Sequence, residues 1–578
     1  MGKVCRIVNQ PPLVGKTQYE IIIVGAGILG SALAATLGND GRDVLVIERD
    51  WKEPDRIVGE LLQPGGVRAL ERLGLEDCLE GIDAIPCNGY AVFYHGDEVR
   101  LPYPTDKLPN EGRSFHHGRF VGKLRERAKG ADNVTALEAS VTELISCPVT
   151  DKVLGVRYSY KDSEGTSLTA NVYAPLTIVA DGCFSRFRKH VNNTPVQSKS
   201  QFVGMILEDC PLPYPNHGHV ILADPSPILL YQIGTHDTRI LIDIPGKLPS
   251  SSTGALQTYL TTHIAPQLPA TLRSAFLTAL ATQRTRTMPN SFLPSTANTT
   301  PGVLLLGDAM NMRHPLTGGG MTVALWDVVR VREEVLVKGE VGDLRVGEKE
   351  EEGKEEWEKR WEVERKVGRR VKSMHWKRKE LSSVVNVLAQ ALYSLFSAGD
   401  DPHMKDLQRA CFAYFKLGGT CVSTPVGLLA GLIPEPMTLV GHFFAVALYG
   451  VWLILTGRID APTTSSIARE GKEGEGAEVV DGAGGGGGGG EGRLVRPDSA
   501  KDLSGVRKRI TPNSSSSDDV PSVTSAPHTP LPTLTKTAAH PTWPKTLLAL
   551  PHNTARSVLA IYTACVVILP VLWSEVQP

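Results

Sequence analysis

The stretch Glu20-Ile-Ile-Ile-Val-Gly-Ala-Gly-Ile-Leu-Gly30 decides the fold of this 578-residue chain. Its first five residues are mostly apolar, as expected for a strand that is buried on both faces. A glycine-rich turn follows, then a predicted helix over 28–37 that is rich in small residues, and then a second predicted strand over 43–48. We therefore predict a β-α-β unit of the type that binds a dinucleotide.

Each glycine of this G-x-G-x-x-G motif has a separate physical task. Gly25 permits the tight turn, Gly27 lets a pyrophosphate approach the backbone, and Gly30 lets the helix pack closely on the strand. The helix N-terminus offers amides and a positive dipole end to the phosphates. Glu48 lies 18 residues after Gly30, where a carboxylate can accept hydrogen bonds from a ribose diol. Because Glu48 disfavours a 2′-phosphate, FAD or NAD is expected here rather than NADP.

Two further strand ends carry an aspartate beside a glycine. The apolar run 176–180 ends in Asp181-Gly182, and the run 303–306 ends in Gly307-Asp308, before a glycine run at 318–320. A strand-end carboxylate can bind a sugar or ribityl hydroxyl, and the glycines let backbone amides reach a flat ring before a helix begins. One such aspartate alone is more often a helix cap. All three elements in this order indicate a flavin site.

Composition excludes several classes of protein. Charged residues make up 21% and hydrophobic residues 41%, which suits a chain with a buried core and rules out a wholly disordered one. Lys and Arg number 61 against 62 Asp and Glu, so no overall charge favours nucleic acid. The nine cysteines include no C-x-x-C pair, which predicts reduced thiols and no metal site.

Two apolar runs near the C-terminus predict attachment to a membrane. Residues 437–456 carry no Asp, Glu, Lys or Arg, and residues 557–573 form a second, shorter run. About 20 apolar residues cross the ~30 Å hydrocarbon core of a bilayer, although a buried core helix is the alternative for each run. The N-terminus has no pattern of a secretory signal peptide, and we expect no membrane segment before the first strand.

Several longer sequence motifs resemble those of one known family of proteins. The motif order is similar to that of flavoprotein monooxygenases with the aromatic-hydroxylase fold, and the fuller strings resemble the squalene monooxygenase (squalene epoxidase) family over 18–457 and, loosely, 543–577. The strings are Glu48-Arg-Asp, Glu53-Pro-Asp-Arg-Ile-Val-Gly-Glu-Leu-Leu-Gln-Pro-Gly-Gly66, Phe115-His-His-Gly-Arg119, Ala180-Asp-Gly-Cys-Phe-Ser-Arg-Phe-Arg-Lys189, Gly307-Asp-Ala-Met-Asn-Met-Arg-His-Pro-Leu-Thr-Gly-Gly-Gly-Met-Thr322, Tyr414-Phe-Lys-Leu-Gly-Gly419 and Gly441-His-Phe-Phe-Ala-Val446.

The resemblance implies an FAD enzyme that converts squalene and O₂ into 2,3-oxidosqualene for sterol synthesis, which in fungi leads to ergosterol. It implies electrons from NADPH through cytochrome P450 reductase, and a location on the endoplasmic reticulum membrane or lipid droplets with the catalytic part facing the cytosol. An isolated alkene is nucleophilic, so it needs an electrophilic oxygen, which a flavin C4a-hydroperoxide supplies. The protein must exclude water and place the double bond.

The resemblance also assigns roles to individual residues. Tyr90 matches the active-site tyrosine of the family, and Gln63 is its expected hydrogen-bond partner. Besides the three glycines and Asp181, the expected flavin contacts are Ile28, Leu29, Glu48, Arg49, Arg56, Leu61, Arg125, Val141, Asp308 and Met321. Leu388, Leu392 and Phe396 recur at helical spacing and either line the substrate pocket or simply pack a helix.

The expected fold is α/β: a Rossmann-like FAD-binding domain of the glutathione-reductase type, an inserted antiparallel-sheet substrate domain and a helical membrane-associated region. The predicted FAD-binding parts are 18–85, 114–195 and 298–337, and the substrate-domain parts are 86–113 and 196–297. The remaining predicted segments are a charged insertion at 338–372, membrane-associated helices at 373–457, a disordered linker at 458–542 and an apolar segment at 543–578.

Two other functions compete with this interpretation. One is a soluble aromatic-ring hydroxylase on the same fold, which the apolar runs argue against. The other is a prenyl-protein chaperone of the GDP-dissociation-inhibitor type, which keeps this fold without using FAD. Asp308 and the glycine run disfavour it, and a colourless purified protein would favour it.

Overall fold

A computed structural model describes residues 16–105, 110–162, 164–341, 354–399, 401–458 and 552–576. A five-stranded sheet carries the glycine motif, in the order β18-β12-β1-β2-β8, and all of its pairings are parallel. Its strands are β18 (Val303–Leu305), β12 (Leu176–Val179), β1 (Ile21–Val24), β2 (Val44–Glu48) and β8 (Val134–Glu138). β1 and β12 are buried along their whole length, as their apolar sequences predict.

Helices and a small sheet cover this parallel sheet. The covering helices are α1 (Ile28–Asn39), α2 (Pro64–Leu73), α3 (His117–Lys129) and α6 (Gly320–Arg330), and α1 packs against both α3 and α6. An antiparallel sheet of β9 (Ser140–Ser146), β10 (Val153–Lys161) and β11 (Ser167–Tyr173) contacts β2 and β12. The predicted β-α-β unit is therefore present, with the helix extending two residues beyond the expected end.

A second large sheet has seven strands in the order β17-β13-β16-β15-β14-β5-β6. Its strands are β5 (Gly89–Tyr94), β6 (Asp97–Pro102), β13 (Gln197–Glu208), β14 (Gly218–Ile221), β15 (Ile228–Gln232), β16 (Asp237–Pro245) and β17 (Arg286–Phe292). The sheet was expected to be antiparallel, but β14 pairs with β5 in parallel, so it is mixed. No hairpin turn joins β5 to β14, because β5 comes from an earlier segment of the chain, so their pairing need not be antiparallel.

Shorter elements connect and cover the two large sheets. A three-stranded sheet of β3 (Leu61–Leu62), β7 (Gly112–Ser114) and β4 (Ile85–Cys87) follows the glycine-motif unit. Helices α4 (Ala255–Tyr259) and α5 (Ala270–Thr282) pack on one face of the seven-stranded sheet through a separate apolar cluster. Short helices η5 (Gly307–Ala309) and η6 (Pro315–Thr317) precede α6.

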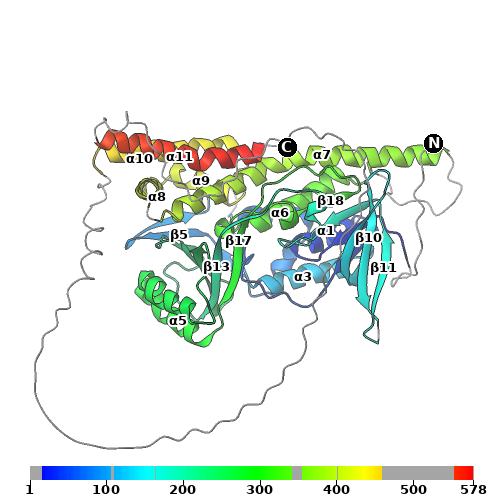
Figure 1. Cartoon of the computed structure of the whole chain (residues 1–578), viewed down its shortest axis with the longest axis horizontal. Helices are drawn as coiled ribbons and strands as arrows, with labels where there is room; N and C mark the ends of the chain where they lie inside the picture. Colours follow the sequence, from blue (N-terminus) through cyan, green and yellow to red (C-terminus); the bar gives the residue numbers. More distant parts are fainter. Residues whose placement is uncertain are drawn as a thin grey trace, which may run out of the picture. The chain divides into compact units, whose positions relative to one another are not determined.

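The described residues of the C-terminal region form five helices: α7 (Lys354–Phe396), α8 (Pro402–Lys416), α9 (Thr420–Leu429), α10 (Pro436–Leu455) and α11 (His552–Val576). Figure 1 shows α7, α10 and α11 along one edge of the molecule. The charged segment 354–372 is continuous with the apolar half of α7, so the predicted insertion at 338–372 is not separate from the helices that follow it. Residues 342–353 and 459–551, which include most of the predicted linker, lie outside the described residues.

Helices α10 and α11 are long and apolar enough to cross a membrane. Only 28% of the apolar window in α10 and 22% of that in α11 is buried, which disfavours the alternative that they are core helices. Their exposed side chains include Leu448, Trp452, Leu569 and Trp573.

Candidate functional site

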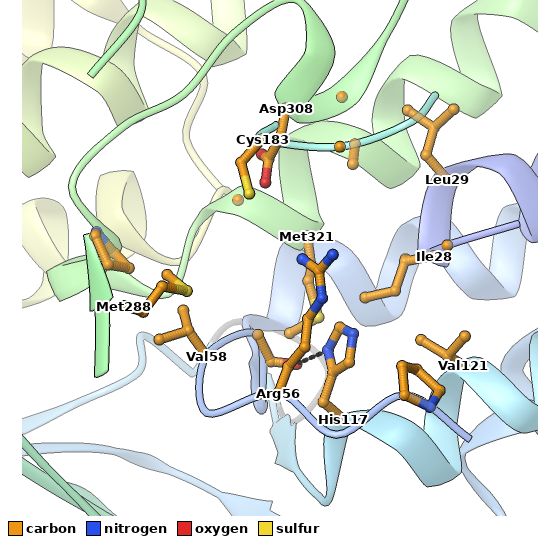
Figure 2. A pocket seen from close by; sticks show the side chains of 18 of the residues that line it. Ile28, Leu29, Arg56, Val58, His117, Val121, Cys183, Met288, Asp308 and Met321 are labelled. Atoms are coloured by element: carbon orange, nitrogen blue, oxygen red, sulfur yellow. Dashed lines mark hydrogen bonds between the residues drawn. The ribbon is translucent and has the colours of Figure 1, made fainter. Parts of the chain in front are cut away.

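A cavity of about 800 Å³ lies where the C-terminal ends of the parallel strands meet the seven-stranded sheet. Its lining comes from all three motifs found in the sequence: the glycine turn at 25–29, the loop 180–184 and the loop 306–308. Ligands of α/β sheets bind at this edge, because the strand ends and helix N-termini converge there. Figure 2 shows Asp308 and Cys183 across the cavity from Arg56 and His117.

The glycine turn leaves space where a phosphate would bind. Gly25 has a φ of +98°, and a Cβ there would lie 2.6 Å from the carbonyl oxygen of Ala180. A Cβ on Gly30 would lie 1.9 Å from the carbonyl oxygen of Gly25, so the helix and the turn can pack only with glycine at this position. A Cβ on Gly27 meets nothing within 4 Å. Gly27 thus opens the turn toward the cavity, which fits the approach of a pyrophosphate.

Glu48 and Arg125 form the polar end of the cavity. The amide of Ala26 donates to Glu48 Oε2 at 2.7 Å, and Arg125 Nε donates to the carbonyl of Ala26 at 2.9 Å. The guanidinium of Arg125 also lies 3.8 Å from Glu48 and donates to the carbonyl of Lys52 at 2.6 Å. This arrangement fixes a carboxylate and a guanidinium beside the glycine turn, with Arg49 and Val141 also lining the cavity.

Arg188 joins the two aspartate loops to each other. It donates to the carbonyls of Cys183 at 2.9 Å, Asp308 at 3.0 Å and Ala309 at 2.8 Å. Asp181 accepts a hydrogen bond of 3.0 Å from the amide of Arg186. Sequence reasoning missed Arg188, although it lies within the quoted string 180–189. Its three carbonyl partners come from loops more than 100 residues apart, so the sequence alone cannot reveal its role.

The Asp308 side chain faces the open space of the cavity and is exposed there, with protein around the cavity on its other sides. The surrounding protein desolvates the carboxylate and raises the pKa of Asp308, while Arg313, Arg56 and Arg188 act in the opposite direction. His117 lies across the cavity, and burial lowers its pKa to about 4. His117 Nδ1 lies 2.9 Å from the carbonyl of Gly59, which requires the proton to be on Nδ1.

Tyr90 and Gln63 make the contact that the resemblance predicts. Gln63 Nε2 donates to the hydroxyl of Tyr90 and to the carbonyl of Thr317, the latter at 2.8 Å. The hydroxyl of Tyr103 donates to Gln63 Oε1 at 2.7 Å, a partner that sequence reasoning missed. Burial raises the pKa of both tyrosines, so both hydroxyls are protonated at neutral pH.

The other wall of the cavity is apolar and comes mainly from the seven-stranded sheet. Its side chains include Val220, Leu229, Tyr231, Leu241, Met288 and Leu316. A cavity with one polar end and one apolar wall can hold a dinucleotide with a flat ring beside a hydrocarbon.

Most of the predicted site residues lie around this one cavity. Gly25, Gly27, Ile28, Leu29, Glu48, Arg49, Arg56, Leu61, Tyr90, Arg125, Val141, Asp181, Asp308 and Met321 line it. Gly30 and Gln63 lie behind the lining, the first within the turn and the second behind Tyr90. Leu388, Leu392 and Phe396 are absent from the lining and pack in apolar clusters, which favours the helix-packing alternative.

Among the described residues, no group of His, Cys, Asp and Glu could hold a metal ion. The eight cysteines in the described part of the chain form no disulfide with one another.

Comparison with known proteins identifies the family. The squalene epoxidase family model matches residues 173–467, and the model of an NAD(P)-binding Rossmann-like domain matches residues 23–52. The chain is 51% identical over 442 residues to squalene epoxidase erg1 of Aspergillus fumigatus, covering 75% of this chain and 86% of the relative. The chain belongs to the squalene epoxidase family. It is therefore a member of an enzyme family.

Other relatives in the squalene epoxidase family come from distant organisms. Squalene monooxygenase of Mus musculus is 49% identical and covers 75% of this chain and 72% of its own length. Squalene epoxidase 3 of Arabidopsis thaliana is 49% identical, and the match covers 76% of this chain and 79% of that protein.

Solved structures share the fold of this squalene epoxidase family member at low sequence identity. The p-nitrophenol 4-monooxygenase PnpA of Pseudomonas putida DLL-E4 has a TM-score of 0.56 at 17% identity, covering 73% of this chain and 99% of that one. The flavin-dependent brominase Bmp2 has a TM-score of 0.53 at 15% identity, and the match covers 75% of this chain and 99% of that one.

Proposed function

We propose that this enzyme epoxidises squalene to 2,3-oxidosqualene with O₂ and a bound FAD, in sterol biosynthesis. The observation that carries the proposal is the convergence of the three motif turns around one cavity in a chain of the squalene epoxidase family. The expected domain division is also part of this proposal, because the FAD-binding and substrate parts each contribute one wall of the cavity.

The residues around the cavity fit FAD. The open face of Gly27 leaves space for a pyrophosphate, and the helix N-terminus at Ile28 offers it backbone amides. Glu48 and Arg125 would hold the ribose of the adenosine half, since they form the polar end beside that turn. Asp308 would accept from a ribityl hydroxyl, and Met321, at the start of α6, would lie against the ring. Bound and reduced, FAD supplies the electrophilic oxygen derived from O₂.

The protein contributes enclosure and positioning to this reaction. The apolar wall excludes water and orients the hydrocarbon, so that the terminal double bond meets the ring. Tyr90 is a polar group on this side, and Gln63, which Tyr103 holds, fixes the direction of its hydroxyl. With its proton retained, the Tyr90 hydroxyl can donate a hydrogen bond to oxygen that becomes more negative during the transfer.

The electrons would come from NADPH through cytochrome P450 reductase. The support for this partner is the family resemblance. A partner flavoprotein would reach the FAD from the open side of the cavity.

The membrane proposal rests on α10 and α11. Near its start, α11 is tied to α8 by Arg556, which donates to Asp406 at 2.7 and 2.6 Å. Near its end, Asn386 on α7 donates to Glu575 at 2.8 Å. These two contacts are 19 residues apart, or about 28 Å along the helix. A helix tied to the enzyme at both ends fits a position along the membrane surface, with Leu569 and Trp573 directed into lipid.

The test is purification of the full chain in detergent, followed by NADPH, reductase, squalene and O₂. We expect a yellow protein that releases FAD on denaturation and forms 2,3-oxidosqualene. A colourless protein would show that no flavin is bound, which would favour the chaperone alternative. Hydroxylation of phenols without a reductase would favour the aromatic hydroxylase. The endoplasmic reticulum location is tested by imaging the tagged full chain, and a wholly soluble distribution would contradict it.

A further inference from the structure

A buried polar network connects the end of α11 to the wall of the cavity. Its members are Asn311 and Arg313 before η6, Asp327 on α6, Arg378 and Asn386 on α7, and Glu575 on α11. All are at least 92% buried. The network joins three segments that are far apart in the sequence, and α11 lies beside α7 (Figure 1).

Arg313 is the member that reaches the cavity. Its side chain lines the cavity, and its hydrogen bonds within the described residues go to Asn311, at 3.2 Å to the carbonyl and 2.6 Å to Oδ1. Its Nε and Nη1 are buried without a partner in the described part of the chain. A buried guanidinium whose partner is a neutral amide depends on nearby carboxylates for its charge balance.

Asn311 is the point where the network converges. Its Oδ1 lies within hydrogen-bond distance of three donors: Arg313 at 2.6 Å, Asn386 at 3.3 Å and Arg378 at 3.4 Å. Its Nδ2 donates to the carbonyl of Leu293 at 2.7 Å, which fixes the orientation of the amide. Two of these three donors are guanidinium groups, so positive charge is concentrated around one neutral oxygen.

Two carboxyl groups face this charge from opposite sides, and burial raises the pKa of one of them, Glu575. Asp327 accepts from Arg378 Nε at 2.8 and 2.9 Å, so it balances Arg378 directly. Glu575 accepts from Asn386 at 2.8 Å, and Lys379 donates to the backbone carbonyl of Glu575 at 2.6 Å. Burial and Arg378 lower the pKa of Arg313 to about 10, whereas Asp308, Asp327 and Glu575 act to raise it.

We propose that Glu575 is a positioning residue for the flavin site, acting through Asn386 and Asn311 on Arg313. Seating of the apolar helix α11 is then part of building the cavity wall beside Asp308. This inference rests on the proposed flavin site, since Arg313 faces the position of the flavin. It gives α11 a role in the active site in addition to its proposed contact with lipid.

The test compares both ends of the same helix in the full-length protein. The variants are Glu575→Gln, Glu575→Ala and Asn386→Ala, and Arg556→Gln is the matched control, because it also neutralises one buried charge that ties α11 to the enzyme. The first readout is the dissociation constant of FAD, from flavin fluorescence on titrating the apoprotein. The second readout is hydrogen exchange of the peptide covering 307–319.

Glu575→Ala and Asn386→Ala should each weaken FAD binding by about tenfold, the typical effect of losing a hydrogen bond to a charged group. Exchange over 307–319 should rise in both variants. Arg556→Gln should change FAD binding by less than about twofold, since it does not reach Asn311. Glu575→Gln keeps an acceptor oxygen and loses only the charge, so an intermediate effect is expected.

Equal FAD binding in Glu575→Ala and Arg556→Gln would overturn the proposal, because Glu575 would then act only by docking the helix. Unchanged exchange over 307–319 would overturn it as well. If Glu575→Ala does not fold, the result for Asn386→Ala tests the proposal, since this variant breaks the connection between Glu575 and Asn311 without changing α11. A wild-type protein that binds no FAD would instead refute the proposed function itself.

Discussion

Arg239 on strand β16 donates hydrogen bonds of 2.8 Å to both carboxylate oxygens of Glu60, and both side chains are buried. Glu60 lies in the loop that carries Arg56 and Leu61 to the cavity, while β16 belongs to the seven-stranded sheet. This ion pair therefore fastens the loop beside the proposed flavin to the sheet that forms the apolar wall.

Breaking this pair on one side should be costly. Arg239→Met leaves the Glu60 carboxylate buried and unpaired, and we expect it to lower the free energy of unfolding by about 3–5 kcal/mol. The double variant Arg239→Met with Glu60→Gln should recover part of that loss. Urea unfolding of the three proteins measures both effects. A single variant as stable as the wild type would contradict this account of the pair.

The second prediction separates ligand binding from folding at the glycine turn. Gly27→Ala places a methyl group in open space, so the apoprotein should keep its thermal stability while FAD binding weakens by at least about tenfold. Gly122→Ala is the matched control, because its Cβ also meets nothing and Gly122 lies on α3 outside the cavity lining. FAD titration and thermal unfolding are the measurements. An equal effect of both substitutions on FAD binding would refute the role of Gly27.

The third prediction concerns Tyr90. Tyr90→Phe removes the hydroxyl that Gln63 and Tyr103 orient, and we expect kcat for epoxidation to fall by about tenfold or more with FAD content unchanged. Because burial raises its pKa, the hydroxyl stays protonated between about pH 6 and 9, so the pH profile should keep its shape in the variant. Loss of FAD from the variant would mean that Tyr90 supports the fold of the site instead.

The fourth prediction is a pH dependence of stability that comes from His117. Burial lowers its pKa to about 4, below the ~6.5 of an unfolded histidine, so the unfolded chain binds the proton more readily between these values. Stability should therefore fall as the pH drops from about 6.5 to 4. His117→Gln should make this dependence shallower, as measured by urea unfolding at several pH values. Parallel curves for the two proteins would contradict the assignment.

The fifth prediction tests the membrane face. Leu569→Asp, on the exposed side of α11, should reduce binding of the full chain to lipid vesicles several-fold, because a charge in the apolar layer is costly. Leu277→Asp on α5 is the control, since Leu277 is also an exposed leucine and α5 lies far from α10 and α11 (Figure 1). Vesicle co-sedimentation measures both variants. Equal binding of Leu569→Asp and the wild type would show that this face does not contact lipid.

Local patterns in the sequence predict the parts of the site that one segment builds. The strand at 21–24, the turn at Gly25–Gly30 and the helix after it follow from apolar periodicity and from the space that only glycine leaves. The apolar helices α10 and α11 follow from hydropathy in the same way. Family resemblance adds the Gln63–Tyr90 contact.

The parts that the sequence could not predict depend on contacts between distant segments. Arg188 joins two loops, and Tyr103 supports Gln63 from a segment 40 residues away. Glu575 reaches Asn311 through Asn386 on α7, almost 200 residues away in the chain. Nothing in their own neighbourhood distinguishes these residues from surface charges or core tyrosines. The parallel pairing of β5 with β14 could not be predicted either, because it too joins distant segments of the chain.

The most direct test of the central claim is a single turnover with oxygen-18 gas. The purified full chain is reduced without oxygen by NADPH and reductase, and squalene and labelled O₂ are then added. The account predicts that the yellow absorbance bleaches on reduction and returns with oxygen, and that 2,3-oxidosqualene carries one labelled atom. Product that forms without a flavin absorbance change, or squalene that stays unoxidised while the flavin is reoxidised, would contradict it.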